Sequence, residues 1–155
     1  MKIMFVCLGN ICRSPTAEAV FCHLVAKKNL SNQIFADSGG TANYHIGKTA
    51  HEGTMGILKS YGIPYDGKAM HFEARHLQEF DGIVAMDKEN LSDILRLKDK
   101  NSKAWVKLLS DFSKGSWRDV PDPWYTGNFE QTYELILEGC EMLLEYIIEE
   151  MKSFR

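Results

Sequence analysis

Short apolar segments alternate along the chain with longer segments whose apolar residues recur at helical spacing. The segments expected as strands cover residues 2–6, 33–37, 80–87 and 105–109, and Ser38, Gly39 and Gly40 are expected to end the second one. The segments expected as helices start at Ser14 and cover 49–62, 88–97 and 133–151. This alternation favours a mostly parallel four-stranded sheet flanked by helices on both faces. We therefore expect one α/β domain over residues 1–155.

Charge and cysteine content exclude several classes of protein. The net charge is −3 and no block of Lys or Arg occurs, which argues against a nucleic-acid partner or a polybasic membrane surface. The apolar run from Ile3 to Leu8 is too short for a signal peptide or a membrane span. Four cysteines are too few for a disulfide scaffold in 155 residues. We expect a cytoplasmic protein that is a monomer or a weak dimer, with export without a signal left open.

The segment CLGNICRSP, from Cys7 to Pro15, lies between the first expected strand and the first expected helix. A cysteine is a nucleophile as a thiolate, and a helix N-terminus or a nearby cation lowers the pKa of such a thiol. A cysteine in a buried strand is ordinarily a small core residue. The arginine six residues after it, together with the strand-to-helix context, favours a functional role for Cys7 and Arg13.

The loop from Leu8 to Cys12 is suited to binding an anion. Its backbone N–H groups can point inward at the start of a helix, and Gly9 and Asn10 tolerate left-handed backbone conformations. The guanidinium of Arg13 matches two phosphoryl oxygens, and the hydroxyl of Ser14 can donate to the thiolate. The candidate phosphate-binding residues are Leu8, Gly9, Asn10, Ile11, Cys12, Arg13 and Ser14. This combination predicts phosphoryl transfer through a cysteine.

The sequence resembles the low-molecular-weight protein tyrosine phosphatases, which carry a Cys-x5-Arg-Ser motif near the N-terminus. The resemblance starts with CLGNICRSPTAEAV and continues through DSGGT (37–41), FDGIVAMDKENL (80–91) and VPDPWYTG (120–127). It implies hydrolysis of phosphotyrosine in proteins, and of aryl phosphates, through a phosphocysteine intermediate without a metal or other cofactor. Inorganic phosphate is then the expected product and an inhibitor.

The same resemblance assigns the general acid to Asp122, in the segment PDPW. A departing phenolate needs a proton, and the two flanking prolines can hold a carboxyl group on a stiff turn. From the residues alone, a simple Asp-Pro turn is the better interpretation. Asp119 lies three residues earlier and lacks a following proline, so the family pattern favours Asp122.

The resemblance also implies supporting and pocket residues. In the family a serine and a histidine hold the loop asparagine; Ser38 matches the serine, but Phe72 stands at the expected histidine position, with His71 next to it. Either His71 replaces that histidine or the network is incomplete. Aromatic pocket walls would favour phosphotyrosine over phosphoserine. The residues at the pocket positions are Leu8, Tyr44, Trp124 and Tyr125.

Cys12 is expected either to fill space beneath the loop or to protect Cys7. Peroxide oxidises an accessible thiolate to a sulfenic acid, which a nearby thiol converts to a disulfide. Residues 7 and 12 bracket one loop, so a modest backbone shift could bring their sulfurs together. The family resemblance supports the same pairing.

Two other functions are alternatives. Residues 42–49, ANYHIGKT, fit a relaxed Walker A pattern, and IVAMD, ending at Asp87, resembles a Walker B strand of a nucleotide hydrolase. Tyr44 and His45 are too bulky for backbone amides to reach phosphates there. A module that only binds phosphate or phosphopeptides would need Arg13 but not Cys7. A zinc site is not expected, because no well-spaced cysteine pair is present.

Overall fold

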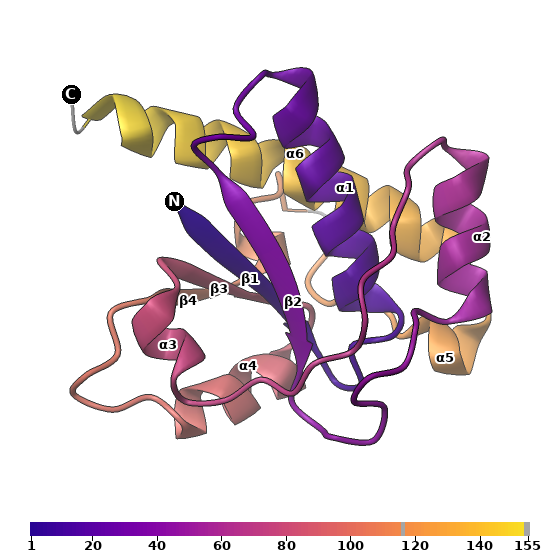
Figure 1. Ribbon diagram of the computed structural model, residues 1–155, viewed down its shortest axis with the longest axis horizontal. Helices are drawn as coiled ribbons and strands as arrows, with labels where there is room; N and C mark the ends of the chain where they lie inside the picture. Colours follow the sequence, from indigo (N-terminus) through magenta and orange to yellow (C-terminus); the bar gives the residue numbers. More distant parts are fainter. Residues whose placement is uncertain (116, 154–155) are drawn as a thin grey trace.

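The computed structural model describes residues 1–115 and 117–153, and a parallel sheet of four strands lies at its centre (Figure 1). The strands are β1 (Lys2–Cys7), β2 (Phe35–Gly40), β3 (Gly82–Ala85) and β4 (Trp105–Leu108), in the spatial order β2-β1-β3-β4. Each neighbouring pair is parallel, which confirms the predicted fold class. The winding direction changes between β1 and β3, and sheets of this kind bind ligands at the carboxyl ends of the strands beside such a point.

Helices cover both faces of the sheet (Figure 1). They are α1 (Arg13–Lys27), α2 (Glu52–Ser60), α3 (His76–Glu79), α4 (Lys88–Arg96), α5 (Pro123–Thr126) and α6 (Phe129–Ser153), with a 3-10 helix, η1, at Leu109–Asp111. Successive residues of β1 point to opposite faces. Ile3 and Phe5 join the core formed with α1 and α6, whereas Met4 and Val6 join the core formed with α3 and α4. Residues 3–7 of β1 and all of β3, the two central strands, are therefore buried on both faces.

The predicted end of the second strand is wrong. Residues 38–40 continue β2, and Gly40 is in register with Cys7. A Cβ atom at position 40 would lie 2.7 Å from the carbonyl oxygen of Leu8 and 3.1 Å from the backbone nitrogen of Asn10. The missing side chain of Gly40 therefore lets β2 run directly beside the loop that follows β1.

Two predicted helix starts also differ from the structure. α1 begins one residue before Ser14, because the Ser14 hydroxyl turns toward the loop instead of capping the helix. α2 begins three residues after Thr49, where the side chain of His51 accepts a hydrogen bond as the N-cap. The short helices α3, α5 and η1 were not predicted, since a single turn carries too little apolar periodicity to be recognised.

Candidate active site

The loop of residues 8–12 connects the carboxyl end of β1 to the start of α1. Its carbonyl groups are held from outside: the Leu8 oxygen accepts from the N–H of Ala42 at 2.9 Å, and the Ile11 oxygen accepts from the N–H of His51 at 2.8 Å. Within the described chain, no backbone N–H of residues 8–12 donates to another backbone group. These N–H groups are therefore available for an anion at the N-terminus of a 15-residue helix.

Asn10 gives the loop its curvature. Its φ angle is +58°, in the left-handed region, and the residue is only 2% exposed. Its Oδ1 atom accepts from the backbone N–H of Met70 at 2.8 Å, which turns Nδ2 toward two serines. Nδ2 donates to the hydroxyl oxygens of Ser14 and Ser38 at 2.8 and 2.9 Å. Every polar atom of this buried amide therefore has a partner.

His71 does not support Asn10. Its Nε2 atom lies 3.3 Å from the carbonyl oxygen of Thr41, and Phe72 is 1% exposed in the hydrophobic core. The backbone N–H of Met70 satisfies the amide oxygen of Asn10 instead. The alternative in which His71 replaces the family's histidine is therefore wrong.

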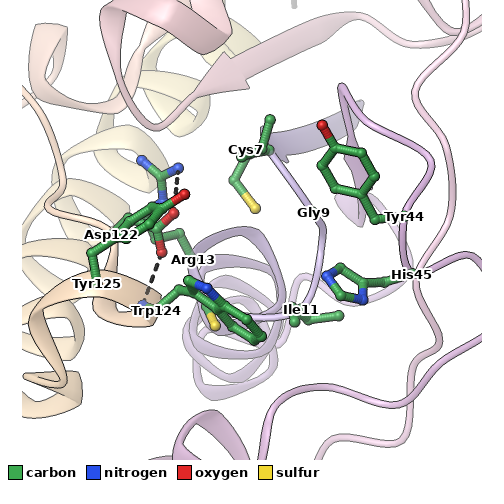
Figure 2. A pocket seen from close by; sticks show the side chains of 11 residues that line it. Cys7, Gly9, Ile11, Arg13, Tyr44, His45, Asp122, Trp124 and Tyr125 are labelled. Atoms are coloured by element: carbon green, nitrogen blue, oxygen red, sulfur yellow. Dashed lines mark hydrogen bonds and ion pairs between the residues drawn. The ribbon is translucent and has the colours of Figure 1, made fainter.

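Cys7 ends β1 and directs its sulfur into the pocket (Figure 2). The Sγ atom lies 3.0 Å from the hydroxyl oxygen of Ser14. Because Asn10 already donates to that oxygen, the Ser14 proton can point at the sulfur; the carbonyl oxygen of Gly39, at 3.4 Å, is a more distant acceptor. Burial raises the pKa of Cys12 to about 12, so the second cysteine of the loop stays a neutral thiol at physiological pH.

The guanidinium of Arg13 lies beside the loop with only 3% of the side chain exposed. Its Nη1 atom donates to Oδ2 of Asp87 at 2.5 Å and to the carbonyl oxygen of Val120 at 3.1 Å. Its Nη2 atom donates to Oδ2 of Asp122 at 3.5 Å. Burial alone would lower the pKa of Arg13, but the charges of Cys7 and Asp87 outweigh burial and raise it. Arg13 is therefore a permanent cation held in one orientation.

Asp87 is a site residue that the sequence did not identify. It lies two residues after the end of β3, the strand next to β1, where it N-caps α4 and also pairs with Arg13. Its similarity to the last residue of a Walker B strand pointed to a nucleotide hydrolase instead. Its place at the carboxyl end of a central strand is the signal that could have revealed it.

A pocket of about 170 Å³ opens above the loop. Figure 2 shows the sulfur of Cys7 with Tyr44 on one side, Asp122 and Tyr125 on the other, and the ring of Trp124 below it in this view. The three aromatic residues are 55–78% exposed, so they stand at the mouth of the pocket. The complete lining consists of Cys7, Leu8, Gly9, Ile11, Cys12, Arg13, Tyr44, His45, Asp122, Trp124 and Tyr125. The structure thus brings together all four residues that the sequence proposed for the pocket walls.

His45 is a further pocket residue, and no sequence pattern pointed to it beyond its place next to Tyr44. Its ring centre lies 6.2 Å from that of Tyr44 and 6.0 Å from that of Trp124. A Cβ atom on Gly9 would lie 2.9 Å from His45 Cδ2, so the glycine permits this close approach. The Walker-like segment 42–49 therefore contributes to a pocket wall. It does not run directly into a helix as a nucleotide loop must, because α2 starts at Glu52.

Asp122 reaches the pocket from the segment before α5. Its Oδ1 atom accepts from the backbone N–H of Trp124 at 3.0 Å, which makes it the N-cap of that short helix, and Oδ2 faces Arg13. Asp119, the competing aspartate, accepts from the backbone N–H of Lys88 at 3.2 Å and does not line the pocket. The structure therefore places Asp122, and not Asp119, beside the loop.

Residues 1–115 and 117–153 contain neither a candidate metal site nor a candidate membrane-spanning helix. No group of three or more His, Cys, Asp or Glu side chains could hold a metal ion. No helix there combines the length and the hydropathy required to span a membrane.

Comparison with known proteins identifies the family. The family model described as low molecular weight phosphotyrosine protein phosphatase matches residues 2–153. The chain is 47% identical over 152 residues to the low molecular weight protein-tyrosine-phosphatase YfkJ of Bacillus subtilis (strain 168), and the match covers 97% of both chains. It is 42% identical over 151 residues to PtpA of Staphylococcus aureus (strain Newman), a protein of the same description, with 97% of this chain and 96% of the relative covered.

Solved structures agree with these matches. The crystal structure of YfkJ has a TM-score of 0.93 to this chain and covers 97% of it and 96% of YfkJ. The crystal structure of DARP, a Drosophila arginine phosphatase, is 31% identical with a TM-score of 0.89, covering 95% of this chain and 98% of that one. A family match over nearly the whole sequence, to relatives of almost equal length and the same fold, shows that this chain belongs to the low molecular weight phosphotyrosine protein phosphatase family.

Proposed function

We propose that the protein hydrolyses phosphotyrosine in proteins, and other aryl phosphates, through a phosphocysteine intermediate. The observation that carries this proposal is that Cys7, Arg13 and Asp122 line one pocket, although Arg13 and Asp122 lie 109 positions apart in the sequence. A sulfur nucleophile, a fixed cation and a carboxyl group are the three groups that metal-free phosphoryl transfer to cysteine requires. The names of YfkJ and PtpA as protein-tyrosine phosphatases support the same activity.

In the first step, the thiolate of Cys7 attacks the phosphorus atom of the substrate. An S–P bond forms while the P–O bond to the tyrosine ring breaks, and the carboxyl group of Asp122 gives its proton to the departing phenolate oxygen. The N–H groups of residues 8–12 and the fork of Arg13 bind the remaining phosphoryl oxygens. Asp87 and Val120 already hold the guanidinium of Arg13 before the substrate arrives, and such preorganised donors stabilise the charge of a transition state.

In the second step, a water molecule attacks the phosphocysteine. The carboxylate of Asp122 takes a proton from the water, a new P–O bond forms, and the P–S bond breaks to return the thiolate of Cys7. The hydroxyl of Ser14 donates to the departing sulfur, for which its 3.0 Å distance is suited. Inorganic phosphate leaves from the same loop and is expected to inhibit competitively.

The pocket walls support an aryl substrate. Tyr44 and Trp124 stand at the mouth, where they can contact the ring of a phosphotyrosine whose phosphate lies against Cys7 (Figure 2). Phosphoserine has too short a side chain to reach both the loop and these rings. We also infer that the protein works in the cytoplasm, because Cys7 has to stay reduced and all four cysteines are free thiols.

Turnover of p-nitrophenyl phosphate and of a phosphotyrosine peptide, with and without EDTA, tests this function. We expect wild-type activity that EDTA does not change, and complete loss in Cys7→Ser with phosphate binding retained. Wild-type rates in Cys7→Ser would overturn the mechanism. A wild-type protein that binds phosphopeptide without hydrolysing it would be a binding module. Faster hydrolysis of phosphoarginine than of phosphotyrosine would assign the substrate class of DARP instead.

A further inference from the structure

A chain of hydrogen bonds continues behind the phosphate-binding loop, beyond the residues that the sequence identified. The Ser38 hydroxyl accepts from Nδ2 of Asn10 at 2.9 Å and donates its proton to Oε1 of Glu18 at 2.6 Å. These directions are determined, because an amide nitrogen only donates and a carboxylate only accepts. Glu18 therefore holds the Ser38 hydroxyl in the orientation that leaves a lone pair for Asn10.

Tyr65 completes this chain from the segment that follows α2. Its hydroxyl donates to the same Oε1 atom of Glu18 at 2.9 Å, and its ring packs against the core beside α1 and α6. Both side chains are half-buried, and this burial raises the pKa of Tyr65 and also that of Glu18. A Cβ atom at position 67 would lie 2.2 Å from the Tyr65 hydroxyl oxygen. Gly67 therefore provides the space that this hydroxyl occupies.

We propose that Tyr65 is a positioning residue, which acts through Glu18 and Ser38 to hold Asn10 and thereby the anion-binding loop. This inference rests on the proposed phosphatase function. It assigns to Tyr65 and Glu18 the supporting role for which His71 was considered.

The energetics of Asn10 explain why its support matters. A non-glycine residue with a positive φ angle is strained, and the strain persists only where the surroundings hold the residue in place. Without the Tyr65 hydroxyl, Oε1 of Glu18 loses one of its two donors, and the carboxylate can rotate away from Ser38. Asn10 then loses its hydrogen bond to Ser38 and keeps only those to Ser14 and Met70, so the loop that it curves is held less firmly around phosphate. The effect is expected on anion binding as well as on turnover.

The test compares Tyr65→Phe with Tyr61→Phe. Both substitutions remove a hydroxyl that donates to a glutamate, but Tyr61 is 47% exposed, and neither Tyr61 nor its partner, Glu130, lines the pocket. For Tyr65→Phe we expect kcat/KM for p-nitrophenyl phosphate to fall about tenfold and the inhibition constant of inorganic phosphate to rise by a similar factor. Tyr61→Phe should match the wild type in both measurements.

A double-mutant cycle separates positioning from general stability. In a Ser38→Ala background the connection to Asn10 is already broken, so adding Tyr65→Phe should not weaken phosphate inhibition further. Equal losses in the two backgrounds, or wild-type phosphate inhibition in Tyr65→Phe, would overturn the inference. Gly67→Ala, which displaces the hydroxyl while keeping the tyrosine, should reproduce the loss of phosphate affinity. A wild-type protein without any turnover would instead refute the proposed function itself.

Discussion

Substitution of Asp87 by asparagine tests how the structure holds Arg13. Asp87 uses its two carboxylate oxygens for different purposes: Oδ2 accepts from Arg13 at 2.5 Å, and Oδ1 accepts from the backbone N–H of Asn90 at 2.7 Å to cap α4. Asparagine has the same shape but only one carbonyl oxygen. Asp87→Asn must therefore either turn an NH2 group toward the guanidinium or give up the cap.

The expected cost follows from the burial of the pair. Removing one partner of a buried ion pair costs about 3–5 kcal/mol, and losing an N-cap costs about 1 kcal/mol. Asp87 is 20% exposed, and Arg13 keeps Val120 and Asp122 as partners, so the first figure is reduced. We expect Asp87→Asn to lower the free energy of unfolding by about 2–3 kcal/mol, equivalent to roughly 4–12 °C in Tm for a chain of this size. Asp87→Ala, which loses both contacts, should cost about 1 kcal/mol more.

Urea unfolding and steady-state kinetics with p-nitrophenyl phosphate measure both consequences. Because a misplaced guanidinium no longer matches the phosphoryl oxygens, kcat/KM of Asp87→Asn should fall by about tenfold or more. Asp93→Asn is the matched control, since Asp93 lies on the same helix and pairs with the 71%-exposed Arg96. That variant should stay within about 0.5 kcal/mol of the wild type. Wild-type stability and wild-type phosphate inhibition in Asp87→Asn would refute the idea that Asp87 holds Arg13.

Three further predictions concern other parts of the protein. Asp122→Asn should slow phenyl phosphate by about 100-fold but p-nitrophenyl phosphate far less, because only a poor leaving group needs the proton; equal slowing over a leaving-group series would assign Asp122 another role. Peroxide should inactivate the enzyme, phosphate should protect it from peroxide, and a thiol reductant should restore its activity. In Cys12→Ser the inactivation should become largely irreversible. If this variant recovers as fully as the wild type, Cys12 has only a packing role. Burial lowers the pKa of His76 below its usual 6.5, and its Nδ1 atom accepts from the backbone N–H of Glu73 at 2.9 Å. Because the imidazole of His76 takes up a proton more readily in the unfolded chain than in the folded one, the free energy of unfolding, measured with urea, should fall as the pH drops below about 6.5. The fall should be less steep in His76→Asn. Identical pH dependence in both proteins would contradict this assignment.

The local features of this protein could be predicted from the sequence because they depend on neighbouring residues. The apolar runs and the helical spacing predicted the four parallel strands and the long α6 helix. The segment from Cys7 to Arg13 predicted an anion-binding loop, since nucleophile, glycine and arginine all lie within one strand-to-helix connection. The prediction failed at Gly40 because a glycine usually ends a strand, whereas here its missing side chain makes room for a loop from another part of the chain.

Contacts between distant segments were decided only by the tertiary structure. Asp87 meets Arg13 across 74 residues because β3 lies next to β1 and ends at the same edge of the sheet. Tyr65 reaches Glu18 across 47 residues, and nothing in the local pattern of either segment indicates the other. Strand order and register determine which side chains share that edge, and they result from the packing of the whole core. The sequence therefore predicts the groups that carry the chemistry, while the packing of the fold selects the residues that hold those groups in place.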